Sequence, residues 1–155
     1  MVLFKFIQSL LTGRTQRTRV GNCFSDAVEL ISGVIQGSCI GPLFFILFIN
    51  SVSRLHDVEI TCKMYADDVK LYMELTCDSG IDKLQKSLEE VSKWAALWQL
   101  PISLTKCTVA LNPKKGDAEP VLFLDKCKLA TVPQMKDLGV TIDSKLKFNA
   151  YIDKI

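Results

Sequence analysis

Two short strand-like runs flank a pair of adjacent aspartates near the middle of the chain. Residues 60–65 (ITCKMY) precede Asp67 and Asp68, and residues 69–73 (VKLYM) follow them. Such runs with a short polar connection predict a β-hairpin with acidic residues at its tip. Because side chains alternate along a strand, only a turn lets neighbouring carboxylates converge, and converging like charges repel unless a cation lies between them. The pair fits two interpretations: a solvated turn, and a site for a divalent cation such as Mg²⁺.

Length and charge set limits on the class of protein. The chain has 155 residues, of which 48% are hydrophobic and 23% are charged, as is typical of one globular domain. The net charge of +2 does not by itself indicate a nucleic-acid partner. Such binding would depend on local clusters, and the densest basic cluster contains Arg14, Arg17 and Arg19. For these arginines, a solvated strand face and contacts with phosphates are both open interpretations.

Cysteine usage and hydropathy bear on the compartment. The six cysteines are spread without a C-x-x-C motif, and His56 is the only histidine, which argues against a zinc site and a secreted disulfide framework. The N-terminus lacks a signal-peptide pattern, and the apolar run 43–49 is shorter than the roughly 20 residues needed to cross a bilayer. We expect an intracellular protein without a membrane partner, in either nucleus or cytoplasm.

Periodicity predicts helices and short strands in alternation. We expect an amphipathic helix at 2–11 and an exposed hairpin from residue 14, with a turn at Gly21 and Asn22. A helix that is apolar on nearly every side should run from Pro42 to about residue 55, enclosed by other elements.

The second half of the chain predicts one long helix and more strands. The helix should begin at Ser79, carry Trp94 and Trp98 on its core-facing stripe, and be closed by Pro101. The remaining elements expected are a strand at 106–111, a loop at 112–117, a hairpin at 121–129 and a last strand at 138–142. The predicted class is α+β, with a single antiparallel sheet that contains the acidic hairpin and is backed by helices.

Taken in order, several segments resemble a reverse transcriptase domain of the non-LTR retrotransposon type. The matching segments cover nearly the whole chain: 11–16 (LTGRTQ), 33–45 (GVIQGSCIGPLFF), 65–72 (YADDVKLY), 98–100 (WQL) with 106–107 (KC), and 136–143 (KDLGVTID).

The resemblance implies part of a right-hand polymerase palm that runs into the start of the thumb. Residues 1–112 would form the partial palm, and residues 113–155 a primer-grip-like hairpin and the start of the thumb, without an independent linker. The implied function is that of an RNA-directed DNA polymerase of a retroelement. It would act by two-metal nucleotidyl transfer, with RNA template, DNA primer and dNTPs as partners.

The resemblance also assigns site residues. Asp67 and Asp68 would be the catalytic, Mg²⁺-binding pair, with Asp67 as a direct ligand, and Lys106 would donate a proton to the leaving pyrophosphate. The residues assigned to nucleotide and template binding are Gln36, Gly37, Tyr65 and Ala66. Those assigned to the primer grip are Leu138 and Gly139.

Departures from the family pattern also have consequences. Ile35 stands where proline is usual, Ser51 where aspartate is common, and Tyr151 where histidine is usual. The family's fingers and first metal-binding aspartate are expected upstream of residue 11, so we expect a fragment with little polymerase activity when isolated. The alternative is a non-catalytic nucleic-acid-binding remnant of a decayed retroelement, in which the arginine cluster would bind phosphates.

Overall fold

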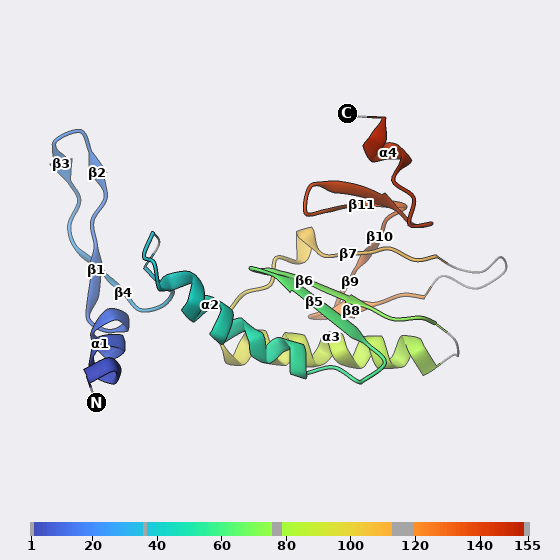
Figure 1. The fold of residues 1–155 in the computed structure, drawn as a ribbon, viewed down its shortest axis with the longest axis horizontal. Helices are drawn as coiled ribbons and strands as arrows, with labels where there is room; N and C mark the ends of the chain where they lie inside the picture. Colours follow the sequence, from blue (N-terminus) through green and yellow to red (C-terminus); the bar gives the residue numbers. More distant parts are fainter. Residues whose placement is uncertain (1, 36, 76–78, 113–119, 154–155) are drawn as a thin grey trace. The chain divides into compact units, whose positions relative to one another are not determined.

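The structure is a computed structural model that describes residues 2–35, 37–75, 79–112 and 120–153 (Figure 1). The chain divides into two compact units, Met1–Asn50 and Ser51–Ile155, and each is described here by itself. The expected division between residues 112 and 113 into palm and thumb parts stays a prediction.

The first unit begins with a helix and a twisted antiparallel ribbon. Helix α1 spans Val2–Leu11, as predicted, and Gly13 follows its end with a φ of +63°, in the region that favours glycine. The ribbon has two ladders joined end to end, and Gly21, with φ +60°, lies in its terminal turn. Its strands are β1 (Arg14–Gln16) with β4 (Val28–Leu30), and β2 (Arg19–Val20) with β3 (Cys23–Phe24).

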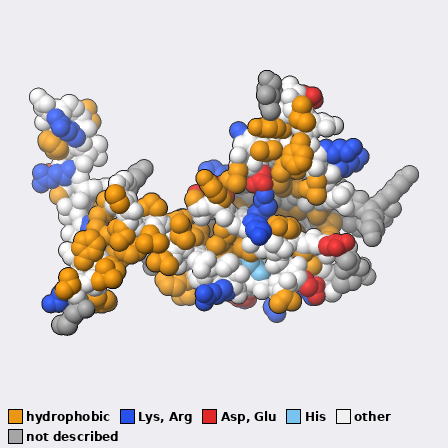
Figure 2. All heavy atoms as spheres, in the orientation of Figure 1, with side chains coloured by type: hydrophobic (Ala, Val, Ile, Leu, Met, Phe, Trp, Pro, Cys, Tyr) orange, Lys and Arg blue, Asp and Glu red, His pale blue; other side chains and the backbone are white. Residues whose placement is uncertain are grey.

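Helix α2 spans Gly41–Ile49 and has Pro42 in its first turn. Proline is tolerated there because N–H groups of the first turn have no acceptor within the helix. At Asn50 the chain changes to a 3₁₀ helix, η1 (Asn50–Arg54), so the α-helix is shorter than predicted. The expected enclosure is not found within its unit, since Leu43, Ile46 and Leu47 are 53%, 55% and 64% exposed. Figure 2 shows hydrophobic side chains gathered at the surface over α1 and α2.

The second unit is organised on helix α3 (Ser79–Leu97), which begins where the sequence predicts. Its end is set by Gln99 rather than by Pro101. Gln99 has φ +54°, its N–H donates to Ala96 O at 3.3 Å, and the Leu100 N–H donates to Ala95 O at 2.9 Å. These two bonds form a Schellman motif, which closes the helix before the proline is reached.

The core of this unit lies where α3 packs against the strands that follow it. Strands β8 (Phe123–Leu124) and β9 (Cys127–Lys128) form the predicted hairpin, and Leu122, Leu124 and Leu129 are its buried residues. The Gln85 side chain on α3 both donates to Phe123 O at 3.1 Å and accepts from the Phe123 N–H at 2.9 Å. Residues packed against this cluster are Ile81, Leu84, Leu88, Ile102, Leu104, Cys107 and Val109.

The strands pair two by two. In the described parts of the chain there are six two-stranded ladders, five antiparallel and one parallel. The α+β class is confirmed, but the expected single sheet is wrong, because most strands are only two to four residues long and do not extend pairing to a third strand. The parallel ladder is β7 (Thr108–Val109) with β10 (Ala130–Thr131); an antiparallel ladder is β11 (Gln134–Asp137) with β12 (Val140–Asp143).

Residues 104–106 and the end of the chain differ from the predicted elements. The start of the predicted strand 106–111 is a 3₁₀ turn, η2 (Leu104–Lys106), and the predicted loop 112–117 falls mostly outside the described residues. A short helix, α4 (Asn149–Ile152), was not predicted. Among the helices that the structure describes, none has the length and hydropathy to span a bilayer.

Candidate metal and nucleic-acid site

The acidic hairpin is formed by β5 (Thr61–Tyr65) and β6 (Asp68–Tyr72). Tyr65 pairs with Asp68, so Ala66 and Asp67 alone connect the strands. Ala66 has φ +50°, the left-handed conformation that tight hairpin connections require. The predicted hairpin is confirmed, with Asp67 in the turn and Asp68 as the first residue of the returning strand.

The ladder gives this hairpin two different faces, because cross-strand partners project to the same side. One face carries polar and aromatic side chains, and the other is apolar and partly buried. The polar face contains the pairs Thr61–Tyr72, Lys63–Lys70 and Tyr65–Asp68, and the apolar face contains Cys62–Leu71 and Met64–Val69.

Two exposed carboxylates at a tight turn are suitable oxygen donors for Mg²⁺, which usually takes one or two protein carboxylates and completes its shell with water and substrate phosphates. In the ranges that the structure describes, no group of three or more His, Cys, Asp or Glu side chains could hold a metal. Metal binding by Asp67 and Asp68 therefore stays a prediction from the sequence.

A second tight hairpin carries the predicted primer-grip residues. Leu138 and Gly139 have φ +47° and +92° and connect β11 to β12, so Leu138 and Gly139 form a turn and the last strand begins at Val140. The Lys70 Nζ on the polar face of the acidic hairpin forms an ion pair with Asp137 Oδ2. Sequence reasoning missed both residues. Alternation along β6 places Lys70 on the Asp68 face, but its partner is 67 residues away in sequence.

Two of the three predicted phosphate-binding arginines have contacts within the first unit. Arg14 Nη2 donates to Gly33 O at 2.7 Å and to Ser32 O at 3.3 Å. Arg19 Nε donates to Gly21 O at 2.8 Å, and its guanidinium lies 5.5 Å from the centroid of the Phe24 ring. Arg17 is exposed, so it is the arginine best placed to meet an external phosphate.

The other predicted residues lie on separate elements. Lys106 is the exposed last residue of η2, and Gly37, with φ +82°, belongs to the first unit. Gln36 lies outside the described residues.

The tryptophans and Ser51 have mainly structural contacts. Trp94 is 8% exposed, as its predicted core position requires, and its indole N–H donates to the Ser51 hydroxyl at 2.8 Å. Trp98 lies with its ring centroid 6.4 Å from that of Trp94 and is 49% exposed, so it is at the edge of the core.

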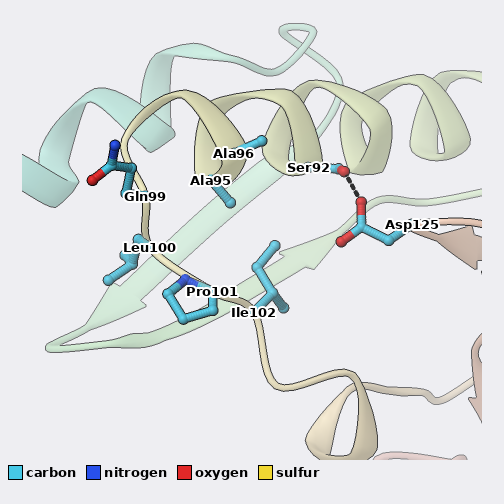
Figure 3. Close-up of a pocket in the computed structure, with 8 residues that line it drawn as sticks. All are labelled: Ser92, Ala95, Ala96, Gln99, Leu100, Pro101, Ile102 and Asp125. Atoms are coloured by element: carbon cyan, nitrogen blue, oxygen red, sulfur yellow. Dashed lines mark hydrogen bonds between the residues drawn. The ribbon is translucent and has the colours of Figure 1, made fainter.

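Two pockets lie in the second unit, and neither is lined by the acidic hairpin. A pocket of about 310 Å³ at the end of α3 contains Gln99 and the hydrogen bond from Ser92 to Asp125 (Figure 3). A pocket of about 320 Å³ contains His56, whose ring nitrogens have no hydrogen-bond partner within the described residues. Burial lowers the pKa of the His56 imidazole.

The chain belongs to the reverse transcriptase (RNA-dependent DNA polymerase) family, whose model matches residues 3–142. This confirms the resemblance to non-LTR retrotransposon reverse transcriptases that the sequence motifs indicated.

Curated relatives are polymerases of mobile elements. The chain is 29% identical over 99% of its length to the RNA-directed DNA polymerase from mobile element jockey of Drosophila funebris. It is 27% identical over 98% of its length to a probable RNA-directed DNA polymerase from transposon X-element of Drosophila melanogaster, and 28% identical over 94% to one from transposon BS. The chain spans only 17–18% of the length of these relatives. No solved structure matches it significantly.

Proposed function

We propose that this chain is part of the catalytic domain of an RNA-directed DNA polymerase, in which Asp67 and Asp68 hold the metal ions of nucleotidyl transfer. The observation that carries the proposal is the two-residue connection between β5 and β6, which puts Asp67 in the turn and Asp68 beside it on the polar face. Family membership supports metal-dependent polymerase chemistry in general. We further propose Mg²⁺ as the metal ion, and a primed RNA template and dNTPs as the substrates.

The roles of the neighbouring residues follow from the hairpin. Bound Mg²⁺ would activate the primer 3′-hydroxyl and stabilise the charge on the departing pyrophosphate. Tyr65 is opposite Asp68 and 67% exposed, so its ring is available to stack against a base or sugar. Ala66 has a side chain small enough to let a nucleotide approach the carboxylates, and Lys106 is the proposed proton donor.

The remaining proposed contacts lie on turns. Gly37 would line the nucleotide and template pocket together with Gln36, and a Cβ at Gly37 would have no atom within 4 Å, which leaves its backbone open to a ligand. Leu138 and Gly139 would contact the primer, and Leu138 is 59% exposed at the tip of its turn. In the second unit, a palm architecture with the start of a thumb would place the Ala66–Asp67 turn and the Leu138–Gly139 turn beside one nucleic-acid duplex.

Metal binding tests this proposal in the full 155-residue chain. Mn²⁺, which favours oxygen ligands as Mg²⁺ does, should broaden the backbone amide NMR signals of residues 65–69, and added Mg²⁺ should reverse the effect. Asp67→Asn should weaken this binding about tenfold or more, because a ligand charge is lost. The control is Asp153→Asn, which changes an exposed aspartate just after α4. Equal broadening in the wild type and the Asp67→Asn, Asp68→Asn double variant would contradict the proposal.

Primer extension tests the isolated chain separately. We propose that the chain alone does not extend a primer on an RNA template, because the metal carboxylates of such a site act as a unit and the described residues bring no third metal-binding side chain to Asp67 and Asp68. The measurement is dNTP incorporation with and without Mg²⁺. Extension that requires Mg²⁺ and is lost in Asp67→Asn would show this part of the proposal to be wrong.

The alternative function, a non-catalytic nucleic-acid-binding remnant, depends on the arginine cluster. Arg14 and Arg19 already donate to backbone carbonyls of their own unit, so the cluster has fewer free N–H donors for phosphates than its sequence indicates, although each guanidinium keeps its charge. In this alternative, nucleic-acid binding would be unchanged by Asp67→Asn, would not require Mg²⁺, and would weaken as added cations compete for the phosphates. The metal titration above therefore separates the two functions.

A further inference from the structure

One ion pair links the two hairpins that carry proposed functional residues. Lys70 on β6 and Asp137 on β11 meet, although the β5–β6 and β11–β12 ladders are separate two-stranded sheets. Within the described ranges, no strand pairing joins one ladder to the other. The relative orientation of the two hairpins therefore depends on side-chain contacts, and this pair is one of them.

Both charged residues lie next to the proposed functional groups of their own hairpins. Lys70 follows Asp68 by two residues on the same face, a rise of about 7 Å along the strand. Asp137 pairs with Val140 and immediately precedes the turn residue Leu138. The ion pair consequently sets the base of the Leu138–Gly139 turn close to the acidic face.

The pair is too exposed to stabilise the fold appreciably. The side chains of Lys70 and Asp137 are 44% and 24% exposed, and exposed ion pairs contribute little because water and salt screen them. Asp137 also offsets the repulsion between Lys70 and Lys63, which lie directly opposite each other on the ladder. The main consequence of the pair is therefore orientation of the two hairpins.

We propose that Lys70 and Asp137 are positioning residues that hold the Leu138–Gly139 turn against the acidic face, so that a recessed 3′ end of a nucleic-acid duplex is presented to Asp67 and Asp68. The inference rests on the proposed function and adds to it the ion pair that orients the two hairpins. The ligand is a primer–template duplex with a recessed 3′ end, in preference to a blunt duplex of the same length.

Charge alone and positioning predict different results for Asp137. If the effect is only electrostatic, removing its negative charge should strengthen binding to both duplexes equally and leave the preference between them unchanged. If Asp137 acts through Lys70, Asp137→Asn should instead reduce the preference for the recessed end. Lys63 is the matched control for Lys70, since it is exposed on the same face, opposite Lys70, and carries the same charge.

The experiment measures fluorescence anisotropy of labelled recessed and blunt duplexes with the full chain and its variants. We expect the wild type to prefer the recessed end, and Lys70→Gln and Asp137→Asn each to lower that preference about threefold to fivefold. Lys70→Arg and the exchange Lys70→Asp with Asp137→Lys should retain it. Lys63→Gln should weaken binding to both duplexes equally. Circular dichroism spectra and thermal midpoints should match among these variants, because an ion pair this accessible to water contributes little to stability.

An unchanged preference in Lys70→Gln or in Asp137→Asn, or an equal loss of preference in Lys63→Gln, would overturn the positioning role while the proposed function stands. A wild-type chain without preference for the recessed end would also overturn the inference. The Mn²⁺ titration at Asp67 then decides independently whether the proposed function fails too.

Discussion

Ala66 adopts a backbone conformation that usually belongs to glycine. Its φ of +50° brings Cβ close to the backbone, at a cost of about 1 kcal/mol for a residue with a side chain. The acidic hairpin nevertheless closes through this residue, because a two-residue connection between twisted strands requires it.

Ala66→Gly should therefore raise the free energy of unfolding by about 0.5 kcal/mol, the relief of strain being partly offset by greater freedom of the unfolded chain. Urea denaturation measures the change. The control is Ala96→Gly, at an exposed alanine of α3, where glycine should lower the free energy of unfolding by about 1 kcal/mol. A destabilised Ala66→Gly variant would contradict the strain at this turn.

His56 makes stability depend on pH. Burial lowers its pKa in the folded chain below the ordinary value of 6.5, so the folded state binds a proton less readily than the unfolded state. Its contribution to stability is present above pH 6.5 and is lost as the pH falls through the folded-state pKa. We expect the urea concentration at the unfolding midpoint to decrease as the pH is lowered from 7.5 to 5.5.

The chain has no other histidine, which makes the control simple. His56→Gln should give a nearly flat urea midpoint over this range, because the carboxylates titrate at lower pH. If the urea midpoint of His56→Gln still depended on pH over this range, the pH dependence would belong to another group.

At the scale of elements, the contact of α3 with the β8–β9 hairpin holds the second unit together. Alternation along β8 turns Leu124 inward, where it is 4% exposed, and Phe123 outward, where it is 44% exposed. The Gln85 side chain fixes the register by bonding both backbone groups of Phe123. The packing of α3 thus depends on one face of a short strand.

Leu124→Ala should lower the free energy of unfolding by about 2–5 kcal/mol, because it leaves a cavity in the cluster of Leu122 and Leu129. Phe123→Ala on the same strand is the control and should cost less, although it removes a larger side chain. Denaturant unfolding measures both. A larger loss in Phe123→Ala would place the core on the other face of β8.

At the scale of the whole molecule, a net charge of +2 leaves nucleic-acid binding to local groups. Arg17→Gln should reduce the slope of log K against log salt by about 1, because one phosphate contact fewer releases about one counterion fewer from the nucleic acid. Fluorescence anisotropy at several salt concentrations measures the slope. Lys145→Gln, an exposed lysine of the second unit, is the charge-matched control. An equal change of slope in both variants would mean that only net charge matters.

The sequence predicts best those elements that are determined by interactions between near neighbours in the chain. Helices α1 and α3 and the acidic hairpin follow from periodicity and turn chemistry, which act over a few neighbouring residues. The end of α3 was predicted at Pro101, and the structure ends it earlier because Gln99 adopts a left-handed conformation. The turn at Leu138 was missed for a similar reason, since a non-glycine residue with positive φ gives little signal in sequence.

The sequence by itself determined the family and the two aspartates at a hairpin turn, because motifs and short-range alternation suffice for both. Only the tertiary structure decided that the strands pair two by two, that Arg14 bonds to Gly33, and that Lys70 meets Asp137. These contacts join residues far apart in the chain. Their partners are selected by the packing of whole elements, which no local pattern of residues encodes.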